Sequence, residues 1–181
     1  MNKIIALVGM TGSGKSEVSS VLNEEGYTVV RFGDATMDYL KEHNLEVNEK
    51  NERMAREKIR KDHGMAGFAI LNKPRLEKAL ENGNVAADGL YSWEEYEFLK
   101  KEFGDKITVV AVYSSPKTRY ARLKHRPVRP LNFEEASSRD KSEIEISHKA
   151  GPIAMADYTI VNEGNLEEMK QFLKKILGRI P

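Results

Sequence analysis

The chain has 181 residues, enough for one domain with a substantial hydrophobic core. Charged residues make up 31% of the sequence and their signs nearly cancel, to a formal net charge of +1, so no overall field attracts nucleic acid or an acidic membrane. Cysteine is absent, which excludes disulfides, thiolate nucleophiles and cysteine-bound zinc, and the four histidines have no close metal-ligand spacing. Any metal is therefore expected to be Mg²⁺ bound through oxygen atoms.

The apolar run near the amino terminus is the one segment that resembles a signal peptide. That run is short, and Lys15 and Glu17 interrupt it before any small-residue cleavage site. No stretch approaches the roughly 20 apolar residues that cross a bilayer. We therefore expect a cytoplasmic protein with no membrane or nucleic-acid partner, and the oligomeric state is left open.

Short apolar runs alternate with helical patterns along the chain, which is typical of an α/β fold with a parallel sheet. The expected strands are Ile4–Val8, Thr28–Phe32, Val85–Ala87, Ile107–Tyr113 and Tyr158–Val161. The first helix is expected to bury Val18, Val21 and Leu22 and to end near Gly26.

Between the first strand and the first helix, the sequence reads Gly-Met-Thr-Gly-Ser-Gly-Lys-Ser, a complete G-x-x-x-x-G-K-S phosphate-binding loop. Its glycines let backbone N–H groups curl around a polyphosphate, and the next helix presents its positive end. The lysine reaches the β- and γ-phosphates, and the last serine can bind Mg²⁺. The pattern predicts that the nucleotide contacts Gly9, Met10, Thr11, Gly12, Ser13, Gly14, Lys15 and Ser16.

Two connections are longer than a parallel crossover needs, and both leave carboxyl ends of strands, where open α/β sheets bind ligands. We interpret residues 1–181 as one domain with an acceptor-binding helical insert at 33–83 and a lid-like insert at 115–150. Within the first insert, Pro74 is expected to end or restart a helix. Two inserts above one phosphate loop suggest a second substrate and a cover.

Two later helices have clear sequence signals. Ser92 and Glu95 have the spacing of a capping box, and Trp93, Tyr96, Leu99 and Phe103 follow on one face, most simply as core residues. The last helix begins near Asn165. It is expected to bury Leu166, Met169, Phe172, Leu173 and Ile176.

Several charged residues are candidates for phosphate or metal contacts. Asp88 ends the third strand, where a carboxylate near Ser16 can hold Mg²⁺ directly or through water; the alternative is an ordinary turn aspartate beside a glycine. Arg119, Arg122 and Arg126 have i, i+3, i+7 spacing in a stretch without acids. We interpret these arginines as a phosphate-clamping lid rather than as a solvated face or a nucleic-acid patch.

A second arginine row lies in the first insert. Arg53, Arg56 and Arg60 repeat the same spacing, and they form either a surface helix with neighbouring glutamates or a clamp for an acceptor's phosphate. Arg31 and Asp34 follow the second strand and are expected at the same mouth of the site.

With these residues together, the chain resembles the nucleoside monophosphate kinases, adenylate kinase in particular, and most closely an archaeal family of adenylate-kinase-related proteins. The resemblance rests on the phosphate loop, Phe32-Gly33-Asp34, Asp88-Gly89, Arg122-Leu123-Lys124-His125-Arg126 and Arg139-Asp140. It implies a three-layer α/β/α sandwich with strand order 2-3-1-4-5. It also implies that Arg122, Arg126 and Arg139 act from the lid, that Asn162 and Gly164 frame the donor adenine, and that Gly89 contacts the acceptor.

The expected activity is ATP- and Mg²⁺-dependent phosphotransfer to a nucleoside monophosphate, with AMP as the first candidate. Adenylate kinases carry acceptor-binding arginines where this chain has Met37 and Ser92, so the acceptor is held differently or is another molecule. The opening loop and Ala156-Asp157-Tyr158-Thr159-Ile160-Val161-Asn162 also resemble dephospho-coenzyme A kinase. That enzyme, and a nucleotide sensor or ATPase without efficient transfer, remain the alternatives.

Overall fold

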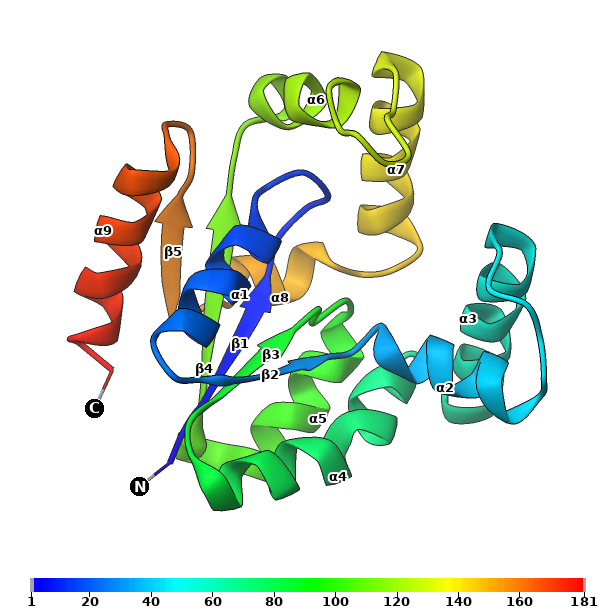
Figure 1. Ribbon diagram of the computed structural model, residues 1–181, viewed down its shortest axis with the longest axis horizontal. Coiled ribbons are helices and arrows are strands. Elements are labelled where there is room, and N and C mark those ends of the chain that lie inside the picture. The colour runs from blue at the N-terminus through cyan, green and yellow to red at the C-terminus, as the bar shows by residue number, and fades with distance from the viewer. Residues whose placement is uncertain (1, 181) are drawn as a thin grey trace.

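Five parallel strands form one sheet in the order β2-β3-β1-β4-β5, which confirms the expected strand order (Figure 1). The computed structural model describes residues 2–180, apart from the side chain of Glu49. Its strands are β1 (Ile4–Val8), β2 (Thr28–Arg31), β3 (Val85–Asp88), β4 (Ile107–Tyr113) and β5 (Tyr158–Val161). All five lie where the sequence predicts them, with shifts of one residue at the ends of β2 and β3.

Helices cover both faces of this sheet, so the fold is the expected three-layer α/β/α sandwich (Figure 1). The helices are α1 (Lys15–Glu24), α2 (Asp34–Glu42), α3 (Glu49–His63), α4 (Gly67–Asn82), α5 (Trp93–Phe103), α6 (Pro116–Lys124), α7 (Phe133–Glu145), α8 (Ala150–Ala154) and α9 (Leu166–Leu177), with a 3₁₀ turn at Gly104–Lys106. Across residues 2–180, none of these helices has both the length and the apolarity that crossing a membrane would need.

The alternation of side chains along β1 explains the two layers. Ile4, Ala6 and Val8 point to a core shared with α4 and α5, whereas Ile5 and Leu7 point to a core shared with α1 and α9. All five side chains are buried, as expected for the central strand of a parallel sheet. The sheet therefore holds the loop that follows β1 rigidly at its carboxyl edge.

Helix α4 corrects one expectation, because it continues through Pro74 instead of ending there. Proline removes the N–H that would bond to the carbonyl of Ile70. On either side of Pro74, however, Phe68 and Leu76 are buried in the same core. In addition, the buried amide of Asn72 donates to the carbonyls of Phe68 (2.9 Å) and Phe32 (3.1 Å). Tertiary packing on both sides of Pro74 thus outweighs the loss of one helical hydrogen bond.

Helix α9 corrects a second expectation. Met169, Leu173 and Ile176 are buried as predicted, but Leu166 and Phe172 are 48% and 45% exposed. The buried side chains form a narrow i, i+4, i+7 stripe, and Phe172 lies outside it beside Lys175. Leu166 is the first residue of the helix and lines a cavity near the phosphate loop.

The two inserts lie at the carboxyl edge of the sheet. Helices α2 and α3 extend to one side of the loop that follows β1, and α6 and α7 extend above it (Figure 1). Helix α6 ends at Lys124, two residues before the last member of the predicted arginine row. Arg126 therefore lies beyond the helix and does not share a helical face with Arg119 and Arg122.

Candidate active site

The loop of residues 9–16 has the backbone of an anion cradle. Gly9, Gly12 and Gly14 have φ angles of +153°, +82° and +98°, which side chains other than glycine rarely adopt. Gly14 precedes α1 without any side-chain cap, so the first N–H groups of this helix remain directed into the cradle. A Cβ atom at Gly14 would also collide with the amide nitrogen of Asn162.

Lys15 folds back over the loop that it belongs to. Its Nζ donates to the carbonyl oxygens of Gly9 (2.7 Å) and Met10 (3.2 Å). Burial, followed by the nearby charge of Lys149, lowers the pKa of Lys15 from 10.5 to about 8. Because burial disfavours the charged form of this ammonium group, an anion bound beside it would stabilise that form.

The hydroxyl of Ser13 lies inside the loop without a hydrogen-bond partner among the described residues. Its oxygen is also buried. The Ser13 carbonyl, in contrast, accepts from Asn162 Nδ2 (2.8 Å) and Ser114 Oγ (3.2 Å). Residues that directly follow β4 and β5 therefore hold the loop in place through this carbonyl.

A cavity of about 520 Å³ opens on the α1 side of the loop. Eight of the residues predicted around the donor line it together, namely Gly12, Gly14, Lys15, Ser16, Arg122, Arg126, Asn162 and Gly164. Arg122 donates to Ser114 Oγ (3.0 Å) and to the carbonyl of Gly164 (3.5 Å). Arg126 donates to the carbonyl of Val128 (2.7 Å). We call this the donor cavity.

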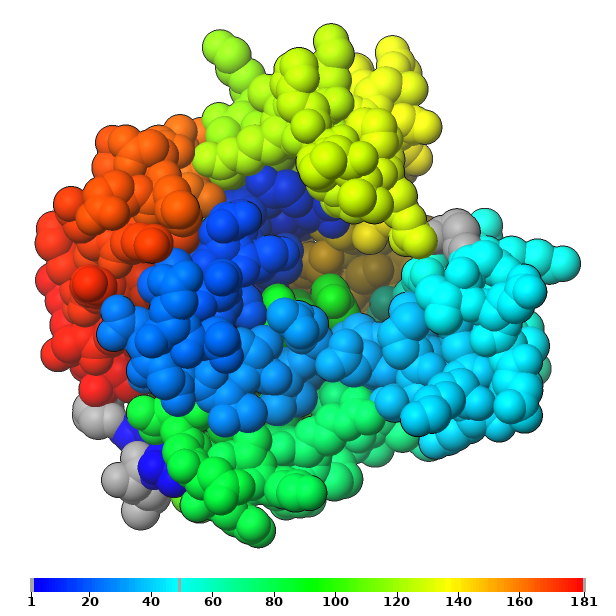
Figure 2. All heavy atoms as spheres, viewed as in Figure 1, coloured from blue at the N-terminus to red at the C-terminus, as the bar shows by residue number. Residues whose placement is uncertain are grey.

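A second cavity, of about 430 Å³, lies between α7 on one side and α2 and α3 on the other, and Figure 2 shows the hollow between them. Its wall carries two acids, Glu52 and Glu143, and two aromatic rings, those of Phe68 and Tyr91. The basic side chains in its wall are Arg56, Arg60, Arg129, Arg139 and Lys149. This acceptor cavity therefore suits a small anion with a flat or apolar part.

The residues predicted for the acceptor are divided by the structure. Arg60 lines the acceptor cavity, and so does Arg139, which the resemblance places in the lid. Gly89 shapes the wall indirectly, because its φ is +111° and a Cβ atom there would lie 2.6 Å from the Tyr91 hydroxyl. Neither cavity is lined by Arg31, Asp34 or Arg53, and the side chain of Arg53 pairs with Glu57 at 2.9 Å on the surface of α3.

The two residues predicted to bind the metal both lie near Lys15. Ser16 lines the donor cavity, and Asp88, at the end of β3, is close enough to act on the charge of Lys15. Within residues 2–180, no three acidic or histidine side chains form a ready-made metal cluster. A hydroxyl and a single carboxylate fit Mg²⁺ that takes its other ligands from phosphate and water.

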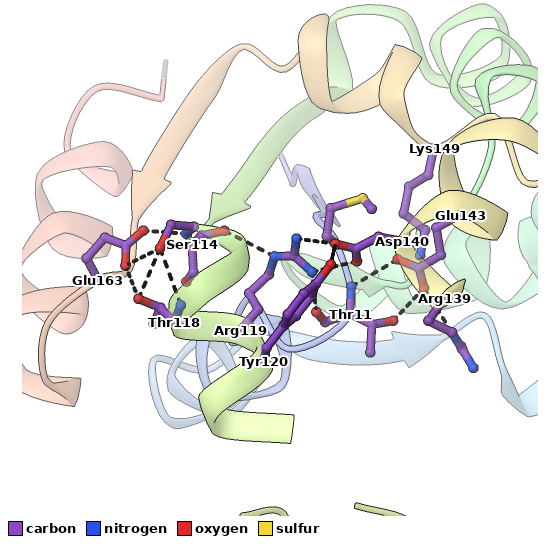
Figure 3. A network of polar contacts seen from close by, with 12 residues as sticks. Thr11, Ser114, Thr118, Arg119, Tyr120, Arg139, Asp140, Glu143, Lys149 and Glu163 are labelled. Atoms are coloured by element: carbon purple, nitrogen blue, oxygen red, sulfur yellow. Dashed lines mark hydrogen bonds and ion pairs between the residues drawn. The ribbon is translucent and has the colours of Figure 1, made fainter. Parts of the chain in front are cut away.

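Arg119 differs from the lid role predicted for it, because its side chain is buried in a fixed network (Figure 3). It forms two hydrogen bonds of 2.6 Å with the carboxylate of Asp140 in α7. It also donates to the carbonyls of Ser114 (3.1 Å) and Thr11 (3.2 Å). Arg119 thus ties α6, α7, β4 and the phosphate loop together.

Two site residues were missed by the sequence interpretation. Glu143 of α7 accepts a hydrogen bond from the backbone N–H of Thr11 (3.0 Å) and another from the Thr11 hydroxyl, and it pairs with Lys149 (2.8 Å) (Figure 3). Neither residue belongs to a motif, and their spacing carries no signal. The hydrogen bond from the Thr11 N–H to this carboxylate shows that the loop backbone can donate to an anionic oxygen atom.

Comparisons with known proteins identify the family. The chain is 35% identical to the UPF0200 protein of Pyrococcus furiosus, covering 98% of this chain and 97% of the relative. It is 37% identical to the UPF0200 protein of Sulfurisphaera tokodaii, with the same coverage. The chain belongs to the UPF0200 family. A family model described as an AAA domain also matches residues 5–148 of this UPF0200 member.

Solved structures share the fold of the UPF0200 chain. TT1252 from Thermus thermophilus superposes with a TM-score of 0.70 at 19% identity and covers 99% of this chain and 98% of that one. A shikimate kinase from Bacteroides thetaiotaomicron gives 0.59 at 15% identity, covering 98% of both chains. The protein therefore has a P-loop kinase-like fold.

Proposed function

We propose that the protein is an ATP- and Mg²⁺-dependent phosphotransferase acting on a nucleoside monophosphate, with AMP as the first candidate, or on a nucleotide-like acceptor. The observation that carries this proposal is the position of one phosphate loop between a donor cavity and a cation-rich acceptor cavity. A hydrolase needs only the first of these cavities. A transferase needs both cavities, and the two must meet where the terminal phosphate of the donor lies.

On the donor side, backbone N–H groups of residues 10–16 would hold the phosphates, and Asn162 and Gly164 would frame the base. Lys15, Arg122 and Arg126 would neutralise charge that develops on the transferred group. Ser16 and Asp88 would hold Mg²⁺, and the ion would supply positive charge next to the phosphates when bound. Such catalysis consists mainly of positioning and electrostatic stabilisation.

On the acceptor side, positive charge dominates the cavity. Arg60 and Arg139 would bind the acceptor's anionic group, and Phe68 and Tyr91 would contact its ring. Met37, which stands where adenylate kinases carry an arginine, also lines this cavity. These neighbouring arginines can replace the missing acceptor contacts.

Dephospho-coenzyme A is the second candidate, and one observation favours it. The carboxylate of Glu143 lies in the wall of the acceptor cavity beside the phosphate loop. A carboxylate there repels an attacking phosphate oxygen but accepts a hydrogen bond from an attacking hydroxyl. The two candidates therefore differ in the atom that attacks.

An acceptor screen tests the proposal. With ATP and Mg²⁺ present, we expect fast ADP release only when one of AMP, CMP, UMP or dephospho-coenzyme A is added, because closure over both substrates excludes water. Chromatography of the products would show a nucleoside diphosphate or a phosphorylated hydroxyl. ADP release at the same rate with every acceptor and with none would instead indicate an ATPase.

Proton uptake on ATP binding tests the environment of Lys15. With a pKa of about 8, half of the Lys15 side chains are protonated at pH 8. Bound phosphate favours the ammonium form, so binding should draw about half a proton from the buffer at pH 8 and almost none at pH 6.5. ATP affinity should accordingly be highest below pH 8 and decrease as the pH rises above it.

Calorimetry in two buffers with different ionisation enthalpies measures this uptake. The Lys15→Met variant is the control, since it has no ammonium group to protonate. Equal binding heats in the two buffers at pH 8 for the unmodified protein would contradict the prediction.

A further inference from the structure

Glu143 lies between the phosphate loop and the acceptor cavity, and its carboxylate contacts both (Figure 3). Oε2 accepts from the Thr11 N–H at 3.0 Å, and Oε1 accepts from the Thr11 hydroxyl. Oε1 also lies 2.8 Å from Nζ of Lys149. The Glu143 and Lys149 side chains are only 5% and 4% exposed, so this arrangement is part of the interior and not a surface ion pair.

Each group that Glu143 holds has a defined place in the site. Thr11 belongs to the phosphate loop, and its carbonyl is fixed from the other side by Arg119 (3.2 Å). Lys149 lines the acceptor cavity, with its ammonium group 5.3 Å from the centre of the Tyr91 ring. Lys149 is also close enough to Lys15 to lower the pKa of that residue. Two lysines, one from each cavity, therefore converge next to Glu143.

We propose that Glu143 is a positioning residue for phosphoryl transfer: its single carboxylate fixes Thr11 and the ammonium group of Lys149 relative to each other at the wall between the two cavities. The donor's terminal phosphate and the acceptor then meet beside both Lys15 and Lys149. This inference rests on the proposed function, because it assigns a role within the same transfer reaction. It goes further by naming the contact that keeps the second lysine charged and in place.

The charges around Lys149 show why this carboxylate matters. Arg139 and Glu143 of α7, Glu95 of α5, Tyr91 and Lys15 face Lys149. Burial lowers the pKa of Lys149, and Glu143 opposes this effect more strongly than any other group. Burial raises the pKa of Glu95 to about 8, so Glu95 is mainly neutral at pH 7.

Glu143 itself stays ionised. Burial alone would raise its pKa, but Lys149 and the hydrogen bonds from Thr11 lower it to about 2. Among the groups that act most strongly on Lys149, Glu143 is thus the carboxylate that is charged at neutral pH. Removing its charge should allow Lys149 to lose its proton.

Three variants separate the effect of the Glu143 charge from the effect of the length of its side chain. Glu143→Gln keeps the shape of the side chain and removes its charge. Glu143→Asp keeps the charge but shortens the side chain by one methylene group, so it cannot reach Thr11 and Lys149 together. Glu145→Gln is the matched control, because Glu145 ends the same helix with its side chain 59% exposed and its nearest lysine, Lys141, 4.0 Å away.

Two measurements apply to each variant. The first is the pKa of Lys149, from NMR of ¹³C-labelled lysine side chains assigned with Lys149→Arg. The second is the pH profile of kcat with the best acceptor of the screen. For Glu143→Gln we expect the pKa of Lys149 to fall by about one unit or more, a tenfold change in protonation, and the alkaline limb of kcat to shift by the same amount.

For Glu143→Asp we expect the Lys149 pKa and the shape of the pH profile to stay near those of the unmodified enzyme. Its kcat should nevertheless fall about 10–100-fold, because the reacting groups are misplaced. Glu145→Gln should match the unmodified enzyme in both measurements. A purely structural role for Glu143 would lower kcat without moving the pH profile of Glu143→Gln.

The outcomes distinguish this inference from the proposed function. Unmodified protein that transfers phosphate to no acceptor overturns the proposed function. Normal transfer combined with an unshifted Lys149 pKa and pH profile in Glu143→Gln overturns only the role of Glu143. If Glu143→Gln does not fold, Thr11→Val provides the test, since it removes the hydroxyl that donates to Glu143; unchanged kcat in that variant would also overturn the proposal.

Discussion

Replacing Lys15 with alanine is expected to lower phosphotransfer turnover by about 10²–10³-fold, the usual effect of removing one group that stabilises developing charge. Lys15 lies in the loop itself and lines the donor cavity, and its ammonium group makes few other interactions. Among the described residues, its side chain donates to the carbonyls of Gly9 and Met10, within the same loop. Initial rates with ATP, Mg²⁺ and the best acceptor measure the effect.

The Lys15→Ala variant should keep its fold. The pKa of Lys15 is lowered from 10.5 to about 8, which shows that the folded protein disfavours this charge and does not depend on it for stability. Lys124→Ala, at the exposed end of α6 and outside both cavities, is the matched control and should retain full turnover. Near-normal turnover in Lys15→Ala would remove Lys15 from the mechanism.

Replacing Asp140 with alanine is expected to lower the free energy of unfolding by about 3–5 kcal/mol, because it leaves the guanidinium of Arg119 buried without its counter-charge. The Arg119 and Asp140 side chains are only 4% and 14% exposed, and two hydrogen bonds of 2.6 Å join them. Tyr120 donates a third bond to the same carboxylate, at 2.9 Å. Urea unfolding followed by circular dichroism measures the change.

The control for this variant is Asp62→Ala, which breaks the exposed pair between Lys58 and Asp62 on α3. Exposed pairs of this kind contribute little, so its urea midpoint should stay near that of the unmodified protein. Equal midpoints for Asp140→Ala and the unmodified protein would show that Arg119 does not need Asp140.

Much of the fold could be predicted because its signals are local. Runs such as Ile4–Val8 and Ile107–Tyr113 are largely apolar, as expected for inner strands of a parallel sheet, and both match the structure residue for residue. The cap at Ser92 was also predictable, since the Ser92 hydroxyl accepts from the N–H of Glu95 at 3.0 Å. Pro74 and Phe172 were misjudged because tertiary packing decides their environments.

The candidate site likewise contains residues that local sequence predicts and residues that only the tertiary structure brings into place. Residues 9–16 carry their geometry in their own sequence, because glycines permit the positive φ angles that a phosphate cradle needs. Glu143 and Lys149 gain their positions only when α7 and α8 fold back toward the loop. An arginine row on a helical face likewise cannot reveal that Arg119 points inward to Asp140, since the partner lies 21 positions further along the chain.

The support behind the phosphate loop has a consequence for how the protein is made. Asn162 of the segment after β5 bonds to the carbonyl of Ser13, which lies 149 positions earlier. Synthesis proceeds from the amino terminus, at about 5–20 residues per second. A nascent chain therefore carries its complete loop sequence many seconds before the ribosome delivers the amide that braces the loop.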